Sequence, residues 1–223
     1  ANTTSGFSIV TYTGTGSNAT VGHGLGAAPK WVITKARTPS GRSWGVFHSN
    51  ISNANNLYLD GTDVESTGGT FWNSTSPTST VFSVGTAGDS NGSSYTLVAY
   101  CFSEVKGFSK FGEYIGGNAN ANGPFVYLGF KPAFIIVRDG DNAENWLMYD
   151  NERPGYNLNN NHLFANTNDQ ETASTANTMD FLSNGFKIRS TNNGLNRSGG
   201  DFLYMAFAEH PFVSSTGTPV TAR

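Results

Sequence analysis

The 223-residue chain contains two copies of one pattern, about 100 positions apart. The triplet Gly-Phe-Ser at residues 6–8 returns at residues 107–109, and Leu-Gly-x-x-Pro at residues 25–29 returns at residues 128–132. Further pairs in the same order are Trp44 with Trp146 and Glu104 with Glu209. A repeat of this length predicts that one structural unit occurs twice, and it limits the fold to arrangements that each half can form by itself.

Short runs of Val, Ile, Tyr, Phe, Trp and Thr alternate with Gly, Asn, Ser and Pro at intervals of about 8 to 15 residues. This spacing is typical of antiparallel sandwiches and barrels. A hydrophobic fraction of 37% and an aromatic fraction of 13% supply enough apolar surface for a core, so the composition is not that of a disordered chain. The sequence therefore predicts an all-β fold.

We predict two tandem antiparallel β-sandwich repeats of the jelly-roll or concanavalin-like type, at residues 1–105 and 106–213, followed by a C-terminal tail at residues 214–223. The predicted strands cover residues 7–13, 20–23, 30–36, 44–49, 57–59, 70–73, 80–84 and 95–103 in the first copy, and residues 108–115, 125–127, 133–138, 146–150, 162–164, 179–182, 185–190 and 202–208 in the second. Val105 and Lys106 are too few residues for a flexible linker, so we expect the repeats to pack together. One sandwich shared by both copies is the alternative.

The overall charge gives no sign of a polyanionic partner. The formal net charge is −3 and the isoelectric point is near 5.8, which disfavours binding to nucleic acid or to an anionic membrane. Cys101 is the one cysteine, and it lies within an apolar strand pattern. We therefore predict a small buried hydrophobic residue there and no disulfide.

The repeat also separates scaffold from candidate site residues. A residue present in both copies serves packing or turn geometry more often than function. By this criterion we assign Trp44, Trp146, Glu104 and Glu209 to the scaffold.

Two aromatic residues have no clear counterpart in the other copy and lie beside polar loops. They are Trp72, followed by Asn73, and Tyr156, followed by Asn157. Exposed aromatic rings stack on sugar faces while amide side chains hydrogen-bond the hydroxyls, and loops on a rigid sandwich carry such sites. We predict these four residues as ligand-binding candidates, with packing in the core as the alternative for each ring.

The segment Asp139-Gly-Asp141-Asn, with Glu144 shortly after it, resembles the start of an oxygen-ligand calcium loop. It departs from a complete EF-hand loop because the glycine comes second and no glutamate follows at the twelfth position. A hairpin turn between two strands explains the same residues. We therefore keep Asp139 and Asp141 as a weak calcium candidate, with no other cofactor.

The sequence indicates neither a catalytic metal site nor a glycosidase site. The four histidines lack metal-ligand spacing, and no pair of carboxylates is placed as a glycosidase requires. The prediction is a protein that is not an enzyme.

Residues 6–14, 21–26 and 100–112 resemble an uncharacterised β-rich domain that is common in the virion proteins of marine tailed phages. Pro29, Lys30 and the end of the chain at residues 219–223 follow the same pattern, so the resemblance covers nearly the whole chain. It implies a tail-fibre or similar virion role at an exposed, extracellular position. The resemblance supplies no site residues.

The leading hypothesis is a non-enzymatic virion domain that binds host-surface carbohydrate. Its predicted partner is a host glycan or a neighbouring virion subunit, and because fibre proteins are often trimers, a homotrimer is one arrangement that it allows. A structural decoration or spacer module without ligand is one alternative. A concanavalin-like glycoside hydrolase or lyase is the other.

Overall fold

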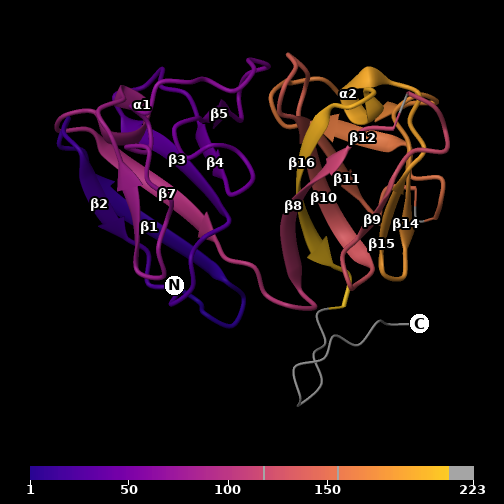
Figure 1. The fold of residues 1–223 in the computed structure, drawn as a ribbon, viewed down its shortest axis with the longest axis horizontal. Helices are drawn as coiled ribbons and strands as arrows, with labels where there is room; N and C mark the ends of the chain where they lie inside the picture. The colour runs from indigo at the N-terminus through magenta and orange to yellow at the C-terminus, as the bar shows by residue number, and fades with distance from the viewer. Residues whose placement is uncertain (118, 155, 211–223) are drawn as a thin grey trace. The chain divides into compact units, whose positions relative to one another are not determined.

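The computed structural model describes residues 1–117, 119–154 and 156–210. The chain divides into two compact units, Ala1–Glu104 (unit 1) and Val105–Arg223 (unit 2), each built from antiparallel sheets (Figure 1). The predicted tail at residues 214–223 lies outside the described residues, as does the end of the second predicted repeat. The prediction of an all-β chain with tandem β-sandwiches is confirmed.

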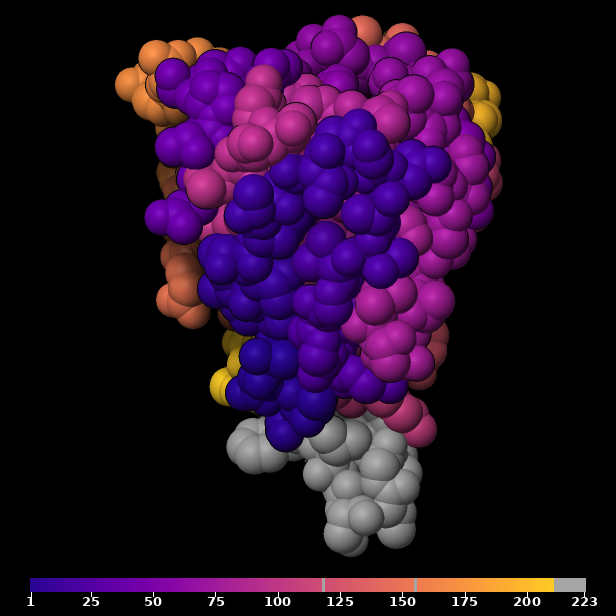
Figure 2. Space-filling model, turned by 90° about the vertical axis from the view of Figure 1, so that its left-hand side faces the viewer, coloured from indigo at the N-terminus to yellow at the C-terminus, as the bar shows by residue number. Residues whose placement is uncertain are grey.

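Unit 1 is a sandwich of a large and a small sheet. The large sheet has the order β1-β7-β3-β4-β5 and the small sheet pairs β2 with β6. The elements are β1 (Phe7–Thr13), β2 (Ala19–Gly22), β3 (Trp31–Thr38), β4 (Gly45–His48), β5 (Leu57–Tyr58), β6 (Val81–Val84), α1 (Gly88–Asn91) and β7 (Thr96–Phe102). Its core lies between the sheets, where Val32 and Phe47 of the large sheet pack with Phe82 and Val84 of the small one. Figure 2 shows the N-terminal strands in indigo beside the magenta end of the unit, as the pairing of β1 with β7 requires.

Unit 2 repeats this plan. Its large sheet has the order β13-β12-β11-β10-β16-β8 and its small sheet the order β14-β15-β9. The elements are β8 (Ser109–Ile115), β9 (Phe125–Tyr127), β10 (Pro132–Asp139), β11 (Leu147–Asp150), β12 (Asn161–Phe164), β13 (Thr172–Ala173), β14 (Met179–Leu182), β15 (Gly185–Ile188), α2 (Asn193–Asn196) and β16 (Asp201–Ala208). The core again lies between the sheets and includes Ile135, Tyr149, Phe181 and Phe186.

A buried asparagine at the end of α1 holds the loops of unit 1. The Asn91 side chain accepts a hydrogen bond from the Thr15 backbone N–H (2.8 Å) and donates to the carbonyls of Ser17 (2.6 Å) and Gly85 (2.7 Å). Asn91 is almost fully buried. Its amide therefore satisfies backbone groups that would otherwise be buried without partners.

Unit 2 builds the same contact from Asn196 at the end of α2. This side chain accepts from the Gly117 N–H (2.6 Å) and donates to the carbonyls of Asn120 and Ser190 (3.0 Å each). Asn196 is also fully buried and lies 105 positions after Asn91. The repeat is thus preserved in a polar core contact as well as in the strands.

A tyrosine hydroxyl joins each short helix to the first strand of its unit. Tyr12 donates to the Ser90 carbonyl (2.6 Å), and Tyr114 donates to the Leu195 carbonyl (2.8 Å). Burial raises the pKa of both phenols, so each remains a hydrogen-bond donor across the physiological pH range.

Most predicted strands are found within two residues of their expected bounds, and β1, β9 and β14 match them in full. The strand predicted at residues 70–73 is wrong, because this segment forms turns. The sequence analysis also missed β13 and the one-turn helices α1 and α2. No helix in the described part of the chain has the length and apolarity of a membrane span.

The two repeated tryptophans differ in burial. Trp146 is fully buried, as predicted. Trp44 is half-buried, and its ring stacks on Tyr100 with 6.3 Å between centroids while the Lys35 ammonium lies 5.3 Å from the ring centre. A repeated position is therefore not always a core position.

Candidate functional site

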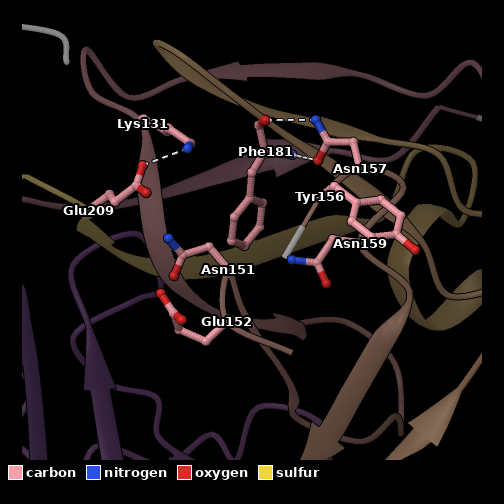
Figure 3. Close-up of a pocket in the computed structure, with 8 residues that line it drawn as sticks. All are labelled: Lys131, Asn151, Glu152, Tyr156, Asn157, Asn159, Phe181 and Glu209. Carbon is pink, nitrogen blue, oxygen red and sulfur yellow. Dashed lines mark hydrogen bonds and ion pairs between the residues drawn. The ribbon is translucent and has the colours of Figure 1, made fainter. Parts of the chain in front are cut away.

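Unit 2 contains a pocket of about 270 Å³. Its residues come from the position just before β10, the connection between β11 and β12, strand β14 and the position just after β16. The residues that line it are Lys131, Asn151, Glu152, Tyr156, Asn157, Asn159, Phe181 and Glu209 (Figure 3). The volume is just below the range of about 300 to 1,000 Å³ typical of small-molecule sites, so a compact ligand fits.

The β11–β12 connection supplies five of these residues, and its first turn is fixed by Asp150. The Asp150 Oδ1 atom accepts hydrogen bonds from the backbone N–H groups of Glu152 (3.1 Å) and Arg153 (3.0 Å). Arg153 forms an ion pair with Asp150 (2.7 Å) and another with Glu171. This turn holds Asn151 and Glu152 at the pocket.

The other end of the connection is fixed by Asn159. The Asn159 N–H donates to the Met179 carbonyl (2.8 Å), and the Asn159 carbonyl accepts from the Met179 N–H (3.0 Å). The Asn159 Nδ2 donates to the Asp150 carbonyl (2.8 Å). Asn159 is 2% exposed, and within the described part of the chain its Oδ1 has no hydrogen-bond partner. A buried acceptor without a partner is unfavourable unless water or a ligand satisfies it.

Asn157 is held by the backbone of β14. Its Nδ2 donates to the Phe181 carbonyl and its Oδ1 accepts from the Phe181 N–H, both at 2.8 Å. One amide hydrogen and one lone pair are left over. The neighbouring Tyr156 ring is 79% exposed, whereas the Phe181 ring is buried.

The charged residues at the pocket differ in their pairing. Lys131 Nζ lies 2.7 Å from Glu209 Oε2, and this ion pair stands to one side of the Phe181 ring in Figure 3. Among the described residues, the Glu152 carboxylate and the Asn151 amide have no hydrogen-bond or ion-pair partner. They are free to bind a ligand.

The pocket can therefore bind a polar molecule that has an apolar face. Amide and carboxylate groups accept and donate hydrogen bonds, while an exposed aromatic ring provides a stacking surface. The structure brings the predicted residues Tyr156 and Asn157 together at this pocket. Asn157 uses half of its amide to position the loop.

The other two predicted ligand residues belong to unit 1 and do not line this pocket. Trp72 is 2% exposed and packs against Phe47 and Phe71 in the core, so it offers no ring face to a ligand. Asn73 has a φ of +52°, and asparagine tolerates this left-handed conformation better than most residues do. Packing and turn geometry explain this pair.

The acidic loop of unit 2 is organised around an arginine. Both oxygens of the fully buried Asp139 accept from Arg197, from Nε at 2.9 Å and from Nη2 at 3.0 Å. Asp141 also contacts this guanidinium, at 3.4 Å. Burial, together with the nearby Asp139 carboxylate, raises the pKa of Glu144.

The calcium site at Asp139 and Asp141 stays a prediction, and the pairing of these carboxylates with Arg197 argues against it. Three of the four carboxylate oxygens contact Arg197, and within the described ranges no group of three or more metal-ligating side chains is found. The segment is the loop between β10 and β11.

Sequence reasoning missed six residues of the pocket, namely Lys131, Asn151, Glu152, Asn159, Phe181 and Glu209. The repeat contained a signal for some of them. The β11–β12 connection is two residues longer than its counterpart and contains a tyrosine, and the position of Lys131 is Ala28 in the first copy. Phe181 was predicted within a strand, but its place at the pocket depends on the packing of the small sheet.

Residues 1–211 match the family described as "Domain of unknown function (DUF7483)". The match spans nearly the whole chain, as the sequence resemblance predicts, although the family description mentions neither phages nor an activity. No curated protein and no solved structure matches the chain.

Proposed function

We propose, on the premise that the chain belongs to this family of unknown function, that it is a non-enzymatic carbohydrate-binding domain of a phage virion protein, such as a tail fibre. The observation that supports binding is the unit 2 pocket. An exposed tyrosine, the amides of Asn151 and Asn157, and a glutamate that has no partner among the described residues converge there. The virion role is supported by the sequence resemblance alone.

Sugars suit this combination of groups better than flat apolar ligands do. A pyranose presents an apolar face of C–H groups for the Tyr156 ring and hydroxyls for the Asn151 amide and the Glu152 carboxylate. The residues also lie on a loop that is fixed at both ends, which reduces the entropy lost on binding.

A glycan array with the purified chain tests this function. We expect binding to at least one bacterial or algal glycan, and we expect Tyr156→Ala to weaken it about tenfold or more, because the stacking surface is lost. Tyr127→Ala is the matched control, since Tyr127 is also exposed in unit 2 but does not line the pocket. If no glycan on the array is bound, or if both variants lose glycan affinity equally, the structural spacer module is favoured.

A hydrolase remains the second candidate because two carboxylates, Glu152 and Glu209, line the same pocket. Glu209 is engaged by Lys131, which argues for a positioning role. Incubation of the chain with each bound polysaccharide should release no new reducing ends. If new reducing ends are released by the wild-type chain but not by the Glu152→Gln variant, the protein is an enzyme instead.

The virion role is tested by genomic context. We expect the genes that flank the coding sequence to encode capsid or tail proteins. Size-exclusion chromatography with light scattering would separate a fibre-like homotrimer from a monomer. A neighbourhood of metabolic genes would contradict the proposal for the virion.

A further inference from the structure

We infer that the pocket of unit 2 selects saccharides without acidic groups over uronate or sulfated sugars; this inference rests on the proposed function and names its substrate class. It follows from the charges at the pocket. Three charged residues line it, Lys131, Glu152 and Glu209. With one cation and two anions, the pocket carries a net charge of −1.

The single cation at the pocket is already neutralised. Lys131 lies 2.7 Å from Glu209 and is held there by an ion pair in which both side chains are partly buried. An acidic sugar would compete with Glu209 for Lys131, whose charge Glu209 already compensates. Arg153, the next cation along the loop, is engaged by Asp150 and Glu171.

Glu152 carries the uncompensated charge. Its backbone is fixed by Asp150, and its carboxylate has no partner among the residues that the structure describes. An ionised carboxylate accepts hydrogen bonds from the hydroxyls of a neutral sugar, and such charge-assisted bonds are stronger than neutral ones. The same carboxylate repels a sulfate or uronate group placed in the pocket.

The uncharged groups of the pocket agree with this specificity. The Asn151 amide oxygen can accept a hydrogen bond from a sugar hydroxyl, so it suits a ligand that carries donors. A neutral sugar has hydroxyl donors on most ring carbons, whereas each sulfate or carboxylate replaces a donor with acceptors. Two acceptor groups, on Glu152 and Asn151, thus favour donors.

The test uses matched glycan pairs. Titration calorimetry of the full chain would compare oligomers of mannose and of mannuronate of equal length, and galactose oligomers with and without sulfate. We expect the neutral member of a binding pair to bind at least about tenfold tighter. Glu152→Gln should reduce the ratio of the neutral-glycan affinity to the acidic-glycan affinity, and Glu152→Lys should reverse the preference.

Glu104→Gln is the control, because it removes the same charge from an exposed glutamate of unit 1 that is absent from the pocket. It should leave the ratio unchanged. If the acidic member binds tighter and Tyr156→Ala abolishes that binding, the sugar-binding function holds and the charge inference is overturned. If neither member of any pair binds, both fail.

Discussion

The β4–β5 connection of unit 1 and the β11–β12 connection of unit 2 occupy equivalent places in the repeat, yet only the second lines the described pocket. Residues 49–56 form the first and residues 151–160 the second. Strand pairing aligns Ser49 with Asn151, because their N–H groups bond Lys30 and Ala133, which are themselves equivalent. Two added residues and a tyrosine distinguish the connection in unit 2. The candidate site therefore lies where the two copies differ.

The repeated glutamates also differ between the two units. Glu104 and Glu209 hold equivalent positions after β7 and β16. Glu209 pairs with Lys131 at the pocket, but the first copy has Ala28 where the second has Lys131. Equivalence in the repeat therefore did not exclude Glu209 from a site, and the assignment of this residue to the scaffold alone was too narrow.

The strongest test of the shared architecture removes the buried asparagines. Asn91→Ala and Asn196→Ala each delete at least three hydrogen bonds and leave buried backbone groups unsatisfied, so each should lower the free energy of unfolding of its own unit by about 3 kcal/mol. Hydrogen exchange measured peptide by peptide in urea would resolve the two units. A large loss in one unit and none in the other would break the equivalence.

A smaller effect should be confined to unit 2. Asp139→Ala leaves the Arg197 guanidinium without its buried partner and should destabilise unit 2 by about 2 kcal/mol, below the full value for a buried pair because Arg197 is partly exposed. The equivalent residues of unit 1, Ala36 and Gly92, form no such pair. The protection of unit 1 against hydrogen exchange should be unchanged in this variant. An equal loss of protection in unit 1 would contradict the prediction that only unit 2 depends on this ion pair.

Cys101 distinguishes unit 1, since its equivalent in unit 2 is Ala206. Burial raises the pKa of the Cys101 thiol to about 12 from an ordinary value of 9.0. The folded state thus holds the neutral thiol, and its contribution is complete below pH 9 and is lost as the pH rises toward 12. Unit 1 should lose about 1 kcal/mol between pH 8 and pH 10, measured by urea denaturation.

The matched control for this pH effect is Cys101→Ala, which should remove that loss. Iodoacetamide at pH 8 should label the wild-type thiol only in denaturant. Rapid labelling of the folded chain would contradict the burial of Cys101.

The smallest expected effect is that of calcium. Because Arg197 pairs with Asp139 and contacts Asp141, added calcium or a chelator should leave the melting temperature unchanged. Differential scanning calorimetry would check this. A rise in melting temperature that Asp141→Asn removes would restore the metal site.

The sequence predicted local structure well and the site only in part. Strands such as β1 and β14 could be predicted from their own residues. The pattern of apolar residues that identifies a strand involves only positions close together in the chain. The segment at residues 70–73 has similar composition, but Phe71 and Trp72 are buried in turns, because tertiary packing rather than alternation decides their place.

The pocket shows the same limit more clearly. Tyr156 could be predicted because it is unpaired in the repeat and adjacent to a turn. Lys131, Phe181 and Glu209 are separated by up to 78 positions in the chain and meet only through strand packing. Composition and spacing carry no information about such contacts.

The β11–β12 connection is anchored at Asp150 and at Asn159, and the residues between these points lie mostly at the surface. Substitutions there alter few core contacts, so natural variation can accumulate without loss of the fold. Under the virion role proposed above, such a segment could change with the host surface while the fold is kept. Diversifying selection should act on this short segment, while the buried asparagines and tyrosines stay constant.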